Sequence, residues 1–504
     1  MTYLPYEEPG ITLILTLTSL IFLLNGIRYI LDRLLYCGLV GQILIGVIWG
    51  EPVGGTTWLS EGTQKAIQDF GYLGLIGLVF EGGLGTDLVL LRKTAYISIS
   101  VATVGLLMPI AISFVLLVFP FPSSSGTLYP SPLAAFSAGA SLCSTSLGTT
   151  LSIMSAAGMH KTRTGVTLLG AAMMDDVVGL VMVNIITTLG AGGRGGWSIA
   201  RPIVASFGLL IVTMCIAPYI MKPVWALVRR AIYHNAEVEF VEAEASLGHR
   251  LTNAITAVPH LQFVLPTAVL IIFVTIASFI DASVLFSAFI AGGLVNYLWD
   301  VGASADPAVS DIASTPSGMF EKYYKPVMAY FLVPFFFASI GFSIPITAMF
   351  SGSIVWKGIV YAILMIVAKG LVSLVVYFDF IVKALQNAMV RQSKAKREKT
   401  RARTRQEPST EQTTIEAPHS AALLIAFAMI ARGEIGFLIA SLSQSSNTLT
   451  LRYTNGEDAA SSGEEIFLVI VWAVVLCTIF GPVAVGVFVR RLKNTTAPRE
   501  LYCE

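Results

Sequence analysis

The stretch LLGAAMMDDVVGLVMV, residues 168–183, places two adjacent aspartates, Asp175 and Asp176, in the middle of a long apolar run. A charged side chain at the centre of a membrane helix costs roughly 2.5–3.5 kcal/mol on insertion scales, so ionisable residues there are functional candidates by default. Neighbouring helical positions point about 100° apart, so both carboxylates can border one cavity but cannot share identical partners. The alternative is a structural pair that a basic residue on another helix neutralises.

An aspartate pair in an apolar helix can hold either protons or a cation. Burial and a neighbouring like charge both favour the protonated form of a carboxyl group. Hard cations such as Na⁺ prefer oxygen ligands, which ionised carboxylates supply. Asp175 and Asp176 are therefore predicted to form a site at which a monovalent cation and protons compete.

The rest of the chain has the composition of a membrane protein. Of its 504 residues, 55% are hydrophobic and 12% are charged, whereas soluble proteins carry about 25% charged residues. This balance excludes a water-soluble enzyme, and a net charge of +1 gives no reason to expect nucleic acid as a partner. The five cysteines show no metal-ligand spacing or secreted disulfide pattern, so we expect them to be reduced and expect no cofactor.

Apolar runs long enough to cross a bilayer, roughly 20 residues each, recur along almost the whole chain. They predict an all-α polytopic membrane protein with about thirteen transmembrane helices. These spans lie near residues 11–30, 37–50, 66–83, 94–119, 131–157, 164–190, 201–228, 261–280, 282–298, 326–346, 354–381, 419–446 and 465–489. The acidic N-terminal residues precede no signal-peptide cleavage site, so the first span is expected to be retained.

The basic residues predict the orientation of these spans. If the spans alternate, 25 of the 32 lysines and arginines fall on one side of the membrane, 5 on the other and 2 inside spans. The positive side is cytoplasmic, which predicts an external or lumenal N-terminus and a cytoplasmic C-terminus, in the plasma membrane or an endomembrane. We expect one transmembrane domain over 1–492, with a cytoplasmic loop at 229–258, a basic cytoplasmic linker at 382–416 and a short tail at 493–504. The linker is read as a solvated tether or as a segment that touches anionic lipid.

Other intramembrane charges lie in the second half of the chain. Lys369, in ILMIVAKGLVSLVV, is too deep to reach the interface easily and needs an anionic partner, for which Asp175 or Asp176 is the candidate. Arg432 and Glu434 lie midway along the twelfth span. A structural salt bridge and a transport role are compatible for Lys369. Glu81, at the end of the third span, is a weaker candidate for which a solvated or helix-end role is favoured.

Two spans have the residues of interrupted helices. The fifth, SAGASLCSTSLGTTLSIM, gathers glycines and hydroxyls at mid-depth, and the twelfth, AMIARGEIGFLIASLS, has Gly433 between its charges. Such hydroxyls either cap broken helices, ligate an ion or bond to their own backbone. The two spans are seven apart, as expected for six-span repeats at 11–190 and 261–489 that a single connecting span inverts.

At the level of motifs, the chain resembles the second branch of the monovalent cation:proton antiporter superfamily, the sodium/hydrogen exchanger family with an Asp-Asp motif. The residues that carry the resemblance are GASLCSTSLGTTLSIMSAAGMHKTRTGVTLLGAAMMDDVVGL at 139–180, together with GLVGQILIGVIWGEP, VFEGGLGTDL, PFFFASIGFSIP, AKGLVSL and RGEIGFLIA. It extends from about residue 11 to residue 492. The SLCSTS segment and the long basic linker depart from the family's usual pattern.

The resemblance implies inverted repeats with crossed discontinuous helices, a dimerisation domain and a mobile core domain that works by elevator-like alternating access. By motif position, Asp176 resembles the ion-binding aspartate, and Asp175 resembles the one that pairs with Lys369. Thr145 and Ser146 match the unwound segment.

The function that the resemblance implies is electrogenic exchange of a monovalent cation for protons. The cation is Na⁺ at Asp176 and Asp175, with Li⁺ or K⁺ as alternatives, and the protein is expected to be a homodimer in the lipid bilayer. A K⁺ efflux protein is the nearest rival, although such relatives usually lack the aspartate pair. An intramembrane aspartyl protease is a remote one, because its two aspartates lie on different helices.

Overall fold

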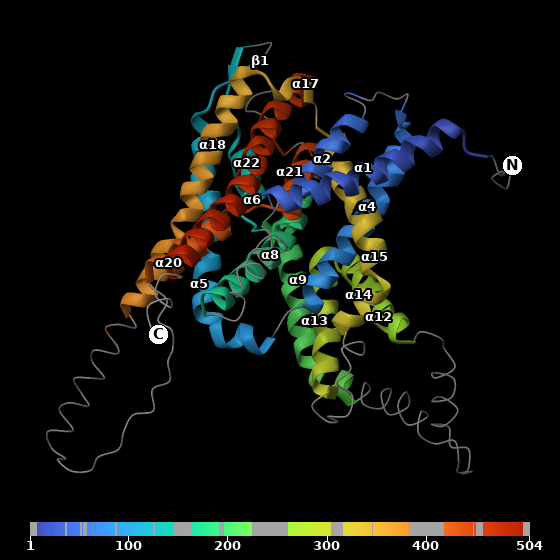
Figure 1. Ribbon diagram of the computed structural model, residues 1–504, viewed down its shortest axis with the longest axis vertical. Coiled ribbons are helices and arrows are strands. Elements are labelled where there is room, and N and C mark those ends of the chain that lie inside the picture. The colour runs from blue at the N-terminus through green and yellow to red at the C-terminus, as the bar shows by residue number, and fades with distance from the viewer. Residues whose placement is uncertain are drawn as a thin grey trace, which may run out of the picture.

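In the computed structural model of the chain, the described residues are 8–35, 38–50, 53, 58–85, 88–123, 126–145, 163–190, 196–223, 261–303, 316–344, 346–382, 385, 418–446, 448–449 and 457–496. The predicted loop at 229–258 and nearly all of the predicted linker at 382–416 lie outside them. Within the described part, helices make up almost the whole molecule (Figure 1).

Most of the α-helices follow the predicted apolar runs, whereas the short helices α14 and α17 lie between them. They are α1 (Ile11–Leu35), α2 (Gly38–Trp49), α4 (Glu61–Leu84), α5 (Leu88–Ser113), α6 (Pro132–Ser141), α8 (Arg163–Gly190), α9 (Gly196–Ile216), α12 (Leu261–Phe279), α13 (Val284–Ala303), α14 (Pro316–Tyr323), α15 (Lys325–Val327), α16 (Val333–Phe342), α17 (Ile346–Met349), α18 (Gly352–Gly370), α20 (Pro418–Ile430), α21 (Glu434–Ser445) and α22 (Glu457–Thr496).

Several smaller elements were not predicted. A 3₁₀ segment, η1 (Phe114–Val118), leads from α5 into a hairpin of β1 (Phe121–Ser123) and β2 (Gly126–Leu128). Two π-helical segments, η2 (Ala217–Met221) and η4 (Met328–Leu332), continue α9 and join α15 to α16. These wide turns free backbone carbonyls that need other donors. The side chains of Asn25 and Arg28 on α1 supply two such donors, to the carbonyls of Tyr330 and Ala329, both at 2.9 Å.

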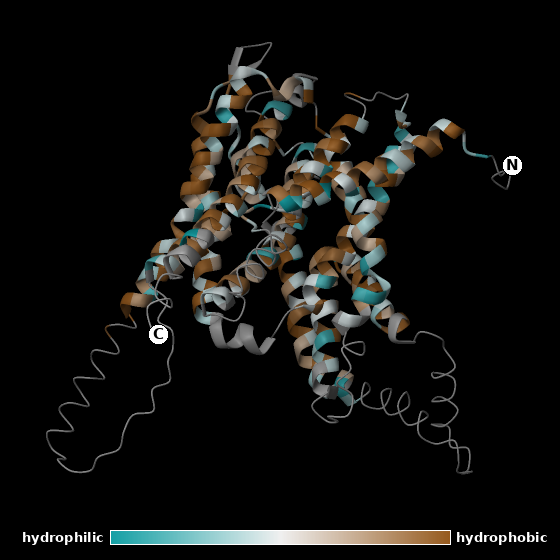
Figure 2. Cartoon of the chain, viewed as in Figure 1, coloured by the Kyte–Doolittle hydropathy of each residue, from teal (hydrophilic) through white to brown (hydrophobic). Residues whose placement is uncertain are grey.

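The helices consist largely of hydrophobic residues (Figure 2), and many of their large apolar side chains are exposed. Among the described residues, eight helical segments are long and apolar enough to span a membrane, and three more apolar helices are shorter. α1 and α9 are the least covered of the eight, with 11% and 17% of their apolar windows buried, so their side chains have lipid as a natural neighbour. The number thirteen stays a prediction.

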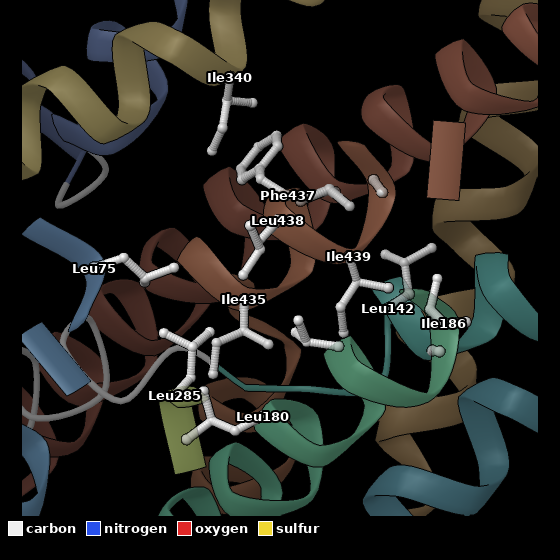
Figure 3. Packing of buried hydrophobic residues seen from close by; sticks show 14 of the residues in the cluster. Leu75, Leu142, Leu180, Ile186, Leu285, Ile340, Ile435, Phe437, Leu438 and Ile439 are labelled. Atoms are coloured by element: carbon white, nitrogen blue, oxygen red, sulfur yellow. The ribbon is translucent and has the colours of Figure 1, made fainter. Parts of the chain in front are cut away.

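The helices pack in two groups (Figure 1). The site group is α5, α6, α8, α18, α20, α21 and α22, and the scaffold group is α1, α2, α4, α12, α13 and α16. α9 contacts α8 in the site group and α13 in the scaffold group. A continuous cluster of buried apolar side chains links the groups, with Leu75 of α4, Leu285 of α13 and Ile435 of α21 among its members (Figure 3).

Backbones in the scaffold group approach one another closely at glycines. A Cβ on Gly46 of α2 would meet the carbonyl of Ala338, and a Cβ on Gly341 of α16 would meet the carbonyl of Ile43. On α4, a Cβ on Gly71 would lie 2.6 Å from the Cα of Phe336. Small residues let membrane helices pack at such short range, so α2, α4 and α16 meet main chain to main chain.

Candidate functional site

The first interrupted helix ends in the interior of the protein. Ser131 caps α6, because its side-chain oxygen accepts the Ala134 amide at 3.0 Å, and Pro132 stands at the first helical position. The helix ends after only ten residues, at Ser141, and the chain leaves helical geometry before the buried residue Thr145. The predicted ligand Ser146 lies outside the described residues.

The second interruption separates α20 from α21 at residues 431–433. Gly433 has extended backbone angles, with φ −144° and ψ −153°, between two helices. Helix α22 supports this break from behind, since Thr478 Oγ1 donates to the Arg432 carbonyl at 3.2 Å. A Cβ on Gly481 of α22 would lie 2.6 Å from the Ala431 nitrogen, so the two backbones are in direct contact.

Arg432 ties the two interruptions together. Its side chain is fully buried, and Nη1 donates to the carbonyl of Ser144 at 2.7 Å and approaches that of Cys143 at 3.5 Å. Freed carbonyls at a broken helix need such donors, because no water reaches them in the bilayer. Arg432 Nε and Nη2 are buried without a hydrogen-bond partner among the described residues. Glu434 begins α21, but its side chain is not among those described.

The aspartate pair lies on α8 beside this crossing. The Asp175 carboxylate is fully buried, and its Oδ2 accepts from Lys369 Nζ at 2.7 Å and from Thr145 Oγ1 at 2.8 Å. Lys369 also donates to Thr145 Oγ1, at 3.0 Å. The threonine hydroxyl therefore accepts from the ammonium and donates to the carboxylate, which closes a triangle of charge-assisted hydrogen bonds.

Three of the four carboxylate oxygens of the pair lie outside this triangle, since only Asp175 Oδ2 takes part in it. Asp175 Oδ1 is buried without a hydrogen-bond partner among the described residues. Asp176 retains 9% exposure, whereas Asp175 has none. The two adjacent residues thus have different environments, one locked to a lysine and one at the margin of the buried region.

Two glycines that the sequence did not single out shape the site. A Cβ on Gly105 of α5 would lie 3.2 Å from Lys369 Nζ and 3.1 Å from Met429 Cε. A Cβ on Gly179 of α8 would lie 3.2 Å from the Cβ of Ser144 and 3.1 Å from Ile435 on α21. Small residues inside apolar helices are the only sequence signal of such contacts.

Two further charges lie away from the crossing. Glu81 is half-buried near the end of α4, where it interacts electrostatically with Lys325, Glu321 and Arg28. Lys357 is 3% exposed on α18, donates to the Pro120 carbonyl at 2.5 Å and lies 4.3 Å from the centre of the Phe121 ring. The sequence did not indicate that Lys357 is buried.

Replacing Gly436 by alanine is expected to destabilise the crossing. The added Cβ would lie 2.7 Å from the Ser141 carbonyl, and overpacking of this kind costs about 1–3 kcal/mol. Gly486→Ala on α22 is the matched control, because nothing lies within 4 Å of its Cβ position. Thermal unfolding of the purified protein measures both variants. Equal melting temperatures would show that α6 and α21 can separate without cost.

Crossed broken helices around a buried charge pair define the architecture of a secondary transporter. The sequence profile described as "Sodium/hydrogen exchanger, transmembrane" matches residues 16–491. The chain therefore belongs to the sodium/hydrogen exchanger family, as its motifs predicted.

Curated relatives are more distant than this match suggests. The chain is 28% identical over 186 residues to the probable Na⁺/H⁺ antiporter GerT of Bacillus cereus, covering 36% of this chain and 46% of that protein. It is 24% identical over 216 residues to a Na⁺/H⁺ antiporter of Enterococcus hirae, covering 42% and 51%. The aligned part thus spans about half the length of these relatives.

A solved structure is similar over nearly the whole fold. The sodium proton antiporter MjNhaP1 of Methanocaldococcus jannaschii matches with a TM-score of 0.59, covering 96% of this chain and 99% of that one, at 14% sequence identity. At this identity the match establishes the fold, and it confirms the predicted antiporter architecture.

Proposed function

We propose that this protein is a secondary active antiporter that exchanges Na⁺ for protons by alternating access. The observation that carries the proposal is the buried Asp175–Lys369 pair, placed with Asp176 where two broken helices cross. Names of the relatives that contain "Na⁺/H⁺ antiporter" support the same activity.

Asp176 is the residue proposed to alternate between the cation and a proton. It is the more accessible of the two carboxylates, and a carboxylate is a suitable ligand for a hard cation. Thr145, in the non-helical end of the described segment, and the predicted ligand Ser146 are the proposed sources of the further oxygens. In the state described here the Thr145 hydroxyl is occupied by Asp175 and Lys369, so it becomes a ligand only if that triangle opens.

The Asp175–Lys369 bridge gives the exchange its proposed stoichiometry. If the cation binds at Asp175 as well as Asp176, it displaces Lys369 from its carboxylate. A buried ammonium without a counter-charge favours loss of its proton. One proton from Lys369 and one from Asp176 then leave for each Na⁺, so one net charge crosses the membrane per cycle.

A K⁺-transporting activity is the second candidate. One relative, 28% identical over 145 residues, is named a Na⁺/H⁺-K⁺ antiporter, GerN of Bacillus cereus. The protease alternative is disfavoured by position, since both aspartates lie on α8 and Asp175 is bound to a lysine.

Proteoliposome flux distinguishes these candidates. With an internal pH-sensitive dye, imposed gradients of Na⁺ and Li⁺ should each drive proton movement in the opposite direction, and a K⁺ gradient tests the alternative. Cation flux without proton counterflow, or no cation response at all, would contradict the proposal.

The proposed orientation is tested separately. A tag at the N-terminus should be accessible from outside, and a tag in the 382–416 linker should be accessible only from the cytoplasm. The expectation depends on the excess of basic residues on the linker side. Protease protection in intact and permeabilised cells measures both tags. An N-terminus on the cytoplasmic side would contradict the predicted count of thirteen spans. The homodimer implied by the resemblance also belongs to this proposal, and its mass in nanodiscs tests it.

A further inference from the structure

Helix α8 carries more than the aspartates on one of its faces. Asp176, Leu180 and Asn184 follow one another at intervals of four residues, so they lie along the same face, about 6 Å apart per step. Leu180 and Asn184 contact the turn between α12 and α13. Their hydrogen bonds cross from the site group to the scaffold group.

Ser283 makes the inner contact. Its hydroxyl donates to the Leu180 carbonyl at 2.8 Å, and the same oxygen accepts the Phe286 amide at 3.2 Å as the cap of α13. Ser283 is 3% exposed, and Leu180 and Leu285 beside it belong to the buried apolar cluster (Figure 3). The hydroxyl therefore uses both its donor and its acceptor, and water does not compete for the bond to α8.

Asn184 makes the outer contact, one turn further along α8. Its side-chain amide donates to the Asp281 carbonyl at 3.1 Å. Asp281 has φ 57°, the only positive φ among the described non-glycine residues. An aspartate tolerates this conformation better than most residues, but the surrounding structure has to stabilise it.

The turn that receives α8 is held firmly by α9. Ser206 of α9 accepts the Ser283 amide at 2.9 Å, and Arg201 pairs with the Asp281 carboxylate. The rings of Phe207 and Phe286 lie 5.8 Å apart between α9 and α13. α9 and the turn at 280–283 thus form one platform, to which the hydrogen bonds of Ser283 and Asn184 tie α8.

We propose that Ser283 and Asn184 are positioning residues, a latch that holds the aspartate-bearing helix against this platform in one of its two transport states and opens in the other. The inference rests on the proposed antiport, because only a carrier needs α8 to move. Two neutral hydrogen bonds suit this role, since each can be exchanged at small cost. In the other state the Ser283 hydroxyl would leave the Leu180 carbonyl and the Asn184 amide would leave the Asp281 carbonyl, as happens when one packed element shifts past another.

The latch makes a directional prediction for transport kinetics. Weakening it destabilises one facing state, so the apparent KM for Na⁺ should rise on one side of the membrane and fall on the other. A cross-helix hydrogen bond in a membrane protein corresponds on average to roughly a threefold change in an equilibrium. Asn184→Ala and Ser283→Gly should each shift the two KM values by about threefold in opposite directions, and the double variant by about tenfold. Glycine is used at Ser283 because it preserves most of the cap on α13.

Thr188→Val is the matched control on the same helix. Among the described residues its hydroxyl donates to the Asn184 carbonyl alone, within α8 and at 2.8 Å, so its removal should leave both KM values unchanged. Ser283→Thr, which keeps a hydroxyl, should restore the KM values of the unmutated protein. A merely structural role would lower the maximal rate in both directions without opposite shifts in KM.

The measurement uses the full-length protein in right-side-out and inverted vesicles, with hydrogen exchange of the purified protein as a second readout. KM values that shift together, or not at all, in the latch variants would overturn the proposal. If the unmutated protein shows no cation/proton transport, the antiport proposal fails. Amide hydrogen exchange then decides on the latch alone. Faster exchange over 276–287 in the latch variants, but not in Thr188→Val, supports the tie to α8, and unchanged exchange refutes it.

Discussion

Replacing Asp176 by asparagine is expected to abolish cation-dependent proton movement while the folded protein remains in the membrane. The variant keeps the size of the side chain but removes the one group proposed to bind Na⁺ and a proton in turn. It also removes a nearly buried charge, which costs roughly 2.5–3.5 kcal/mol at the centre of a membrane helix, so insertion should not suffer. Proton flux in proteoliposomes driven by a Na⁺ gradient is the measurement.

Asp176→Glu is the companion variant for this test. It retains a carboxylate but moves it by one methylene, so a slow and weakly binding exchanger is expected. Robust exchange by Asp176→Asn, at a rate close to that of the unmutated protein, would show that the cation binds elsewhere.

Replacing Asp175 by asparagine is expected to have two separate effects. Lys369 has no other anionic partner among the described residues, and removal of one member of a buried ion pair costs about 3–5 kcal/mol. The melting temperature should fall. Lys369 should also lose the partner that keeps it charged, so it should no longer carry a proton in the transport cycle. Exchange that remains should then ignore the membrane potential, whereas the unmutated protein gains about 2.3 kcal/mol per 100 mV for each net charge.

The double variant Asp175→Asn/Lys369→Met separates stability from transport. It removes both charges, so it should recover much of the lost melting temperature, because an apolar replacement of a buried pair is often neutral. It should not recover the dependence on voltage. Flux is measured under a K⁺/valinomycin potential, once K⁺ has been excluded as a substrate. Equal rates with and without a potential in the unmutated protein would refute the electrogenic cycle.

The interrupted helices could be predicted because their cause is local. Glycines and hydroxyls at 139–150, and Gly433 between two charges, weaken a helix wherever it packs. The structure places the interruptions after Ser141 and at 431–433. The choice between Asp175 and Asp176 as the partner of Lys369 is different, because it depends on how α8 is rotated against α18. Two residues about 100° apart are equally good candidates until that rotation is known, and only the resemblance favoured Asp175.

Contacts between distant segments could not be predicted. Asn184 reads as an ordinary polar residue near a helix end, and its partner at Asp281 lies 97 residues away. In the sequence, Gly105 is one of 44 glycines, and only the fold shows that it lies beside Lys369. The burial of Lys357 depends on the β1–β2 hairpin, which has no clear alternating pattern in its few residues. In each case the information lies in the packing rather than in a local pattern.

The glycine contacts in the scaffold group have a mechanical consequence. Where two helices meet through side chains, rotamer changes let them slide or tilt by small steps. Where Gly46 and Gly341 bring α2 and α16 together main chain to main chain, no side-chain rotamer can adjust to a displacement, so the helices lose backbone packing or meet backbone repulsion when they move. The scaffold group is therefore expected to move as one rigid unit. A rigid scaffold group deforms little when α8 moves against it, so more of the free energy of the ion gradient goes into that movement.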